Sequence, residues 1–317
     1  MTRSVFLRIR VPVLAVLLPL AACKVGPDFT EPSASLAARW LQAGEPAVAT
    51  DRTTYERWWT VFNDPTLNDL VDAAYRQNLT LLAAGTRVLE ARAQLGVAGG
   101  EFYPQAQTVG GSLSYLRPSE NDPSGVTQAG LGEFWRGALA ASATWELDFW
   151  GRFRRGVQAA DAVYLASIAS YDQVLVTLVG DVASTYIGIR TLQAQIAIAR
   201  ANVARQRTAL QIARDRFRGG VSTGLDVAQA ENVLAQTEST VPQLTAQLEQ
   251  GQAALRVLLG LPPQAMDALL AGRPDIPTPP ETVAVGIPAD LVRRRPDIRA
   301  AELRAAAQSE QIGMALS

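Results

Sequence analysis

Apolar side chains recur every seven residues over long stretches of this chain. Between residues 155 and 259 they form two series separated by a short interruption: Leu175, Val182, Ile189, Ile196, Val203, Leu210 and Phe217, then Val227, Leu234, Val241, Leu248 and Leu255. A strict heptad keeps one apolar seam facing a partner helix in a left-handed supercoil. The pattern therefore predicts a coiled-coil helical hairpin over 155–259, with a first helix roughly 90 Å long. An ordinary helical hairpin in a soluble bundle is the alternative.

The interruption between the two series is rich in glycine and small residues. It comprises Gly219, Gly220, Val221, Ser222, Thr223, Gly224 and Leu225. Glycine adopts the positive φ that ends a helix, and Thr223 with Asp226 has the spacing of a capping box that begins the next one. We therefore expect a tight tip between two long helices. A plain turn without further role is the alternative for each of its residues.

A shorter heptad series precedes the hairpin and consists of Leu67, Ala74, Leu81, Val88 and Leu95. It predicts one helix over 66–98. Gly99 and Gly100 end this helix, and Pro104 follows, as is common after a helix stop.

Between these helical regions the apolar period changes from seven to two. Residues 103–117 and 138–149 alternate between an apolar face and a face of small and polar side chains, which predicts two strands joined by a Gly- and Pro-containing loop. Tyr115, Trp135 and Trp145 share the apolar parity. The ten residues between the two tryptophans, in a tilted strand, separate them by roughly 25 Å along a membrane normal, the spacing of aromatic girdles on a membrane barrel.

A half-buried hairpin in a soluble protein is the alternative for these two strands. A lone hairpin leaves both edges unpaired, which the hydrocarbon region of a bilayer does not permit. If the hairpin lies in a membrane, it must be part of a barrel built from several chains.

The N-terminal residues 1–22 read as a secretory signal peptide, because three arginines precede a short apolar run. The run ends in Leu-Ala-Ala before Cys23, the only cysteine, which resembles the lipobox of bacterial lipoproteins. Cys23 is then the lipidated first residue of the mature chain, and Lys24 after it favours the outer membrane by the same resemblance. The alternative is an incidental or buried cysteine. Residues 23–65 read as a lipid-anchored, proline-rich tether.

The C-terminal part begins with a proline-rich linker over 272–297. Shifting the sequence by 217 residues aligns 78–98 with 295–315, with six identities and the same heptad phase. Residues 66–271 are therefore predicted to form a first repeat, and residues 298–317 to begin a second. Chance similarity between alanine-rich helices is the alternative.

Composition narrows the function classes. The chain of 317 residues has no histidine, 29 basic and 30 acidic side chains, and without Arg3, Arg8 and Arg10 of the signal peptide the balance is 26 to 30, or −4. Without histidine, and with a single cysteine, the usual general base and the common metal ligands are missing. We therefore expect no enzyme activity, cofactor or metal site. A mildly acidic chain without a basic stripe also predicts no nucleic-acid partner.

Five motifs stand in order along the chain: residues 23–29 (CKVGPDF), Trp58-Trp59 with Phe62, Asp64-Pro65 and Leu67, residues 145–152 (WELDFWGR), the tip 216–226, and residues 286–297. Together they resemble the outer-membrane efflux protein family, the TolC-like channels, and within it the lipoproteins that partner resistance-nodulation-division pumps. The resemblance covers nearly the whole mature chain.

This resemblance implies a mainly helical fold with a long coiled-coil hairpin and two strands of an oligomeric outer-membrane β-barrel. It further implies a homotrimer anchored in the bacterial outer membrane and extending into the periplasm. Such a trimer is a passive exit duct for drugs or other small molecules, joined through a periplasmic adaptor to an inner-membrane pump. The tip 219–225 would dock the adaptor.

The sequence departs from the family in lacking its second strand pair and second helical hairpin, which carry the family's aspartate gate. We therefore expect a truncated form that does not close a barrel by itself, since the smallest membrane barrels use eight strands. A lipid-anchored periplasmic scaffold or adaptor without a pore is the alternative function, and a secreted hydrolase is a more distant one.

Overall fold

The computed structural model describes residues 24–33, 36–37, 41, 48–49, 57–117, 133–272, 274–284 and 288–317. The predicted signal peptide, Cys23 and most of the loop between the strands lie outside these residues. The chain divides into two compact units. We call the first, Met1–Pro32 with Leu89–Ala166 and Glu302–Ser317, the strand unit, and the second, Ser33–Val88 with Ser167–Ala301, the helical unit.

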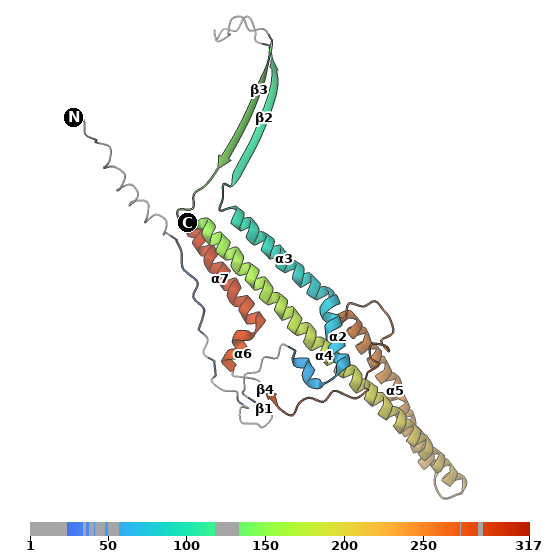
Figure 1. Cartoon of the computed structure of the whole chain (residues 1–317). Helices are drawn as coiled ribbons and strands as arrows, with labels where there is room; N and C mark the ends of the chain where they lie inside the picture. The colour runs from blue at the N-terminus through green and yellow to red at the C-terminus, as the bar shows by residue number, and fades with distance from the viewer. Residues whose placement is uncertain are drawn as a thin grey trace, which may run out of the picture. The chain divides into compact units, whose positions relative to one another are not determined.

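The structure confirms the predicted fold class, which is mainly helical with one antiparallel strand pair (Figure 1). The hairpin consists of α4 (Arg152–Arg218) and α5 (Gly224–Leu258). Its 67-residue first helix is about 100 Å long at 1.5 Å per residue. Most seam positions of α4 are buried, as the heptad predicts, whereas Phe217 at its end is exposed.

The single helix predicted over 66–98 is wrong, because the structure has two, α2 (Pro65–Gln77) and α3 (Leu79–Gly100). Asn78 separates them. Its extended backbone ends α2, and its side-chain oxygen accepts a hydrogen bond from the Leu81 amide at 2.8 Å, capping α3. Its side-chain nitrogen Nδ2 donates to the Leu258 carbonyl at 2.9 Å, which connects the break between α2 and α3 to the end of α5.

The strand pair consists of β2 (Ala106–Leu116) and β3 (Phe134–Thr144), antiparallel with Ala106 opposite Thr144 and Leu116 opposite Phe134. β3 begins and ends earlier than the predicted 138–149, so Trp145, Leu147 and Phe149 lie outside it. The alternating pattern continues past Thr144, but the polar groups there have other partners. The Glu146 amide donates to the Gln105 side chain at 2.8 Å, and Asp148 accepts from the Arg154 amide at 3.0 Å in the first turn of α4.

The predicted tether and linker carry more structure than expected. A 3-10 helix, η2 (Trp58–Phe62), lies within the predicted tether 23–65, and its Trp59 is buried. β1 (Val48–Ala49) from the same segment pairs in parallel with β4 (Val283–Ala284) from the linker 272–297. The linker also contains α6 (Pro288–Arg294), and α7 (Pro296–Leu316) begins before residue 298.

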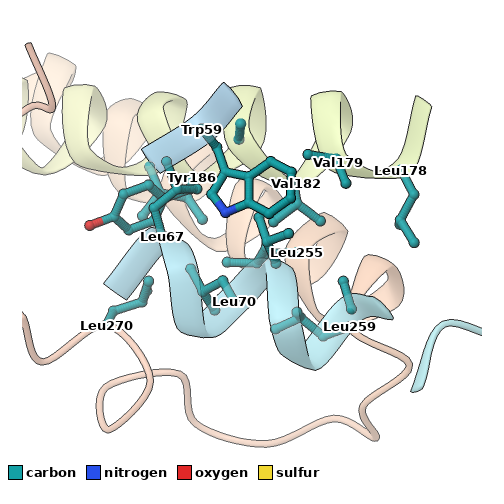
Figure 2. Packing of buried hydrophobic residues seen from close by; sticks show 14 of the residues in the cluster. Trp59, Leu67, Leu70, Leu178, Val179, Val182, Tyr186, Leu255, Leu259 and Leu270 are labelled. Atoms are coloured by element: carbon teal, nitrogen blue, oxygen red, sulfur yellow. The ribbon is translucent and has the colours of Figure 1, made fainter. Parts of the chain in front are cut away.

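The helical unit contains the main hydrophobic core, which we call the helical core (Figure 2). It joins η2, α2, the start of α3, the middle of α4, the end of α5 and the segment after it. Its buried members are Trp59, Leu67, Leu70, Val71, Ala74, Leu81, Leu178, Val179, Val182, Ala183, Tyr186, Ile189, Leu255, Leu259, Met266 and Leu270. The aromatic and aliphatic side chains at its centre come from segments almost 200 residues apart, so the core closes the α4–α5 hairpin onto α2.

Candidate functional site

The strand pair has one apolar and one small, polar face, and both faces are exposed. Directly opposed residues project to the same face of an antiparallel pair. The register therefore gathers the large exposed apolar residues on one side: Val109, Leu113, Tyr115, Trp135 and Leu139. On the other side Thr108 and Ser142 share a hydrogen bond of 2.7 Å. Such a pair can separate an apolar phase from water.

The three predicted interface aromatics occupy two places in the strand unit. Tyr115 and Trp135 are opposed in the register near the loop, with ring centroids 5.1 Å apart. Trp145 lies just beyond β3, where its indole N–H donates to the Phe102 carbonyl at 3.3 Å. Exposed Phe102 and Tyr103 belong to the same aromatic group, and the sequence interpretation missed them. Two consecutive aromatics before Pro104 were the available signal.

These two aromatic groups lie at opposite ends of the strand pair. Eleven residues at about 3.4 Å each span about 37 Å, and a tilt near 40° reduces this to about 28 Å along the normal, close to the apolar band of a membrane barrel. Within the described residues β2 and β3 pair only with each other, so each strand keeps one edge of unpaired N–H and C=O groups. These edges require further strands if the pair enters lipid.

The helical tip lies where α4 passes into α5, and all of its residues are exposed except half-buried Ser222. Gly220 has φ +72°, and the Val221 amide donates to the Arg216 carbonyl at 3.0 Å while the Gly220 amide donates to Phe217. This is a Schellman motif, which satisfies the last carbonyls of α4.

The predicted capping box at the start of α5 is confirmed. The Thr223 hydroxyl accepts from the Asp226 amide at 3.3 Å, and the Asp226 carboxylate accepts from the Thr223 amide at 2.8 Å. The hydrogen bonds that the Thr223 amide and, at 2.9 Å, the Thr223 hydroxyl donate to the Asp226 carboxylate, with a smaller effect of Arg216, hold the pKa of Asp226 below its ordinary value. The capped turn presents Val221 and Leu225 to solvent as exposed apolar side chains.

Two exposed ion pairs link α4 and α5 near the tip. Arg214 contacts Glu231, and Arg207 contacts Glu238, each at 2.7 Å. Exposed pairs of this kind contribute little stability, typically below about 1 kcal/mol. Among the residues that the structure describes, no three His, Cys, Asp or Glu side chains group as they would around a metal ion. The arrangement thus offers surfaces for lipid and protein contacts.

Comparison with known proteins gives consistent matches. The outer membrane efflux protein family matches residues 70–261. Nodulation protein T of Rhizobium leguminosarum bv. trifolii is 31% identical over 315 residues, covering 98% of this chain and 64% of the relative. Toluene efflux pump outer membrane protein TtgF of Pseudomonas putida is 30% identical over 310 residues, covering 95% of this chain and 63% of the relative.

Solved structures give the same result for the fold. The outer-membrane channel OprN matches with a TM-score of 0.81 and 33% identity, over 93% of this chain and 64% of that one. The chain thus spans slightly less than two thirds of the length of these relatives.

Proposed function

Because the chain belongs to the outer membrane efflux protein family, we propose that it supplies strands and helices to an outer-membrane channel. Through this channel an efflux pump releases small molecules by passive, non-enzymatic exit. The observation that carries the proposal is the strand pair. Its exposed apolar face, and its edges that stay unpaired within the described part of the chain, suit a shared barrel in lipid. The long coiled hairpin forms the periplasmic wall of the same duct.

The membrane role of the strand pair can be tested by the reactivity of single cysteines introduced on its two faces. Leu113→Cys and Leu139→Cys lie on the apolar face, and their neighbours Ser112→Cys and Ala140→Cys lie on the polar face. In isolated outer membranes we expect a water-soluble maleimide to label the polar-face variants and to spare the apolar-face variants until the membrane is dissolved in denaturing detergent. The parent chain, with Cys23 alone, gives the background.

The result of this labelling also separates the channel from the scaffold alternative. Equal labelling of both faces in intact membranes would contradict the channel and favour a lipid-anchored periplasmic scaffold whose strands stay in water. In that case the helical hairpin would still be available for protein contacts.

We also propose a homotrimer that docks a periplasmic adaptor, joined to an inner-membrane pump, through tip residues 219–225. Exposed Val221 and Leu225 on a rigid capped turn support this role, since apolar side chains on a fixed backbone are typical contact residues. A photo-crosslinking residue at Leu225 should capture the adaptor in cells, whereas one at Val257, which is also largely exposed but lies at the other end of α5, should not. Capture at both positions or at neither would contradict tip docking.

The same proposal includes a lipid anchor at Cys23. Small residues before the cysteine support it. Radiolabelled palmitate should be incorporated into the parent chain and lost in Cys23→Ser, and incorporation that persists in Cys23→Ser would contradict the assignment.

A further inference from the structure

Arg155, in the first turn of α4, is a buried charge at the meeting point of three segments of the strand unit. Its side chain is 1% exposed. One guanidinium nitrogen contacts the Glu310 carboxylate of α7 at 2.6 Å. Its other nitrogens donate to two backbone carbonyls of the N-terminal segment, Val25 at 3.2 Å and Gly26 at 2.9 Å. Figure 1 shows the C-terminal end of α7 beside the start of α4.

The N-terminal segment fits closely into the site that Arg155 closes. The Val25 amide donates to the Trp150 carbonyl at 3.1 Å. Both the N–H and the C=O of Val25 are therefore hydrogen-bonded, the latter by Arg155. Gly26 lies directly against the backbone of Gly313 in α7, and a Cβ on Gly26 would come within 2.5 Å of the Gly313 Cα. We call this site the cradle. It consists of residues 150–155 and 310–313, and its occupant is residues 24–26.

The chemistry of Arg155 makes the occupied cradle the favoured state. A buried guanidinium whose largely buried carboxylate partner is Glu310 still needs acceptors for its remaining N–H groups. The Val25 and Gly26 carbonyls supply them, and departure of the segment would leave those donors unpaired next to a buried charge. Asp28 also contacts Arg155, at 3.1 Å, but its side chain is 78% exposed, so the contact is largely screened by solvent.

We propose that Arg155 is a positioning residue that holds residues 24–26 in the cradle and thereby fixes where acylated Cys23 leaves the protein. This inference rests on the lipid anchor proposed above. Trp150 follows β3 by six residues, so the docked segment places the acyl chains next to the base of the strand pair. The acyl chains and the strand pair then enter the same membrane surface, at a fixed distance from each other. The cradle is complete only when α7 is in place, because Glu310 and Gly313 belong to that helix.

The Lys24–Val25 peptide bond provides a direct readout, because trypsin cleaves after lysine only when the local backbone is released. In outer membranes containing the whole chain, we expect this bond to resist trypsin. Arg155→Met should accelerate cleavage there by roughly tenfold or more, since two hydrogen bonds to a charged group are lost. Arg155→Lys should give an intermediate rate, because it keeps the charge without the planar fork. Mass spectrometry detects the product that begins at Val25.

Two further variants separate docking from general stability. Gly26→Ala should also expose the bond, because its methyl group collides with Gly313 while the helices stay intact. Arg190→Met removes the buried arginine of the helical unit, and it should lower the thermal midpoint without exposing the Lys24–Val25 bond. The inference is overturned if Arg155→Met and Gly26→Ala leave the cleavage rate unchanged, or if Arg190→Met raises it as much as they do.

Palmitate labelling of the same samples distinguishes this inference from the anchor on which it rests. Labelled protein with Arg155-dependent protection supports both. Absence of label overturns the anchor, and with it the positioning of acyl chains, even where the bond is protected. Labelled protein without protection overturns the cradle alone.

Discussion

Large apolar side chains are buried in the helical core but exposed on the strand pair. Leu255 of the helical core is fully buried, whereas Leu139 of the strand pair is 84% exposed. Burying a leucine contributes about 1.5–3 kcal/mol, and the helical core obtains this contribution within one chain. The strand pair obtains almost none of it. The helical unit therefore packs such side chains within one chain, while the apolar face of the strand pair stays exposed and its edges, among the described residues, stay unpaired.

The largest expected effect follows directly from this contrast. Leu255→Ala should lower the free energy of unfolding by about 2–5 kcal/mol, because it leaves a cavity in a packed core. Leu139→Ala should change it by less than about 0.5 kcal/mol in the absence of a membrane. Urea titration of both variants, followed by helical circular dichroism, makes the comparison. Equal losses would mean that the strand pair packs against a core of its own in water.

The next largest loss of stability is expected at two glycines with similar φ angles. One lies in the packed helical unit and the other at the exposed tip. Gly260, just after α5, and Gly220 at the tip have φ of +65° and +72°. Alanine in this left-handed region costs about 1–2 kcal/mol at either place. At Gly260 the new methyl group would also overlap the Gln77 carbonyl at the end of α2, which adds about 1–3 kcal/mol, whereas Gly220 faces open space.

Thermal unfolding of Gly260→Ala and Gly220→Ala should therefore show the larger loss at Gly260. Gly220→Asn serves as a control, because asparagine tolerates this backbone conformation better than alanine does. A larger loss at Gly220 would contradict the close approach of α5 to α2.

Two tyrosine hydroxyls extend the comparison to polar groups. In the helical core Tyr186 donates to Asp64 at 2.7 Å and accepts from Arg190 at 3.0 Å. Burial, together with the Asp64 carboxylate, raises the pKa of Tyr186, so the phenol stays protonated and can donate. In the strand pair, the Tyr115 hydroxyl donates to exposed Glu133.

Tyr186→Phe should cost about 1–3 kcal/mol, because the Asp64 carboxylate and the Arg190 guanidinium each lose one hydrogen bond inside the core. Tyr115→Phe should cost less than about 0.5 kcal/mol, since water replaces the lost bond. Chemical denaturation of the two variants checks this. An equal cost would show that the Tyr115 hydroxyl is as enclosed as that of Tyr186.

The sequence predicted the seam and the tip well because both are encoded locally. A heptad specifies which side chains face a partner helix, and Val182, Ile189 and Ile196 are buried accordingly. The capping box needs only Thr223 and Asp226, three residues apart.

Features that depend on distant partners were missed. The heptad keeps its phase across Asn78, so it does not register a break that a hydrogen bond to Leu258 stabilises. Strand alternation likewise continues past Thr144, where Gln105 and the first turn of α4 take over the polar groups. Arg155 reads as one of many surface arginines, because its partners lie about 130 and 155 residues away.

The capping box at the tip should have a smaller and more local stability effect than the core residues, since both Thr223 and Asp226 are exposed. Thr223→Ala removes the hydroxyl acceptor for the Asp226 amide and should cost about 1 kcal/mol locally. Amide hydrogen exchange in the first turn of α5 should become several-fold faster, with no change around Leu255. Faster exchange at Leu255 as well would contradict the separation between tip and helical core.

The pH dependence of this turn follows from the lowered pKa of Asp226, which is due first to its hydrogen bonds from Thr223. The ionised carboxylate is favoured in the folded tip, so its stabilisation is present above the ordinary value of 3.8 and is lost as the pH falls through the lower, folded-state pKa. Amide protection in the first turn should therefore persist at pH 5 and decrease below about pH 3.8. In Asp226→Asn the first turn of α5 should be poorly protected already at pH 7, and its protection should not change as the pH falls below about 3.8. A transition of the same size in Asp226→Asn would assign the pH response to another group and leave the capping box without a measurable role at the tip.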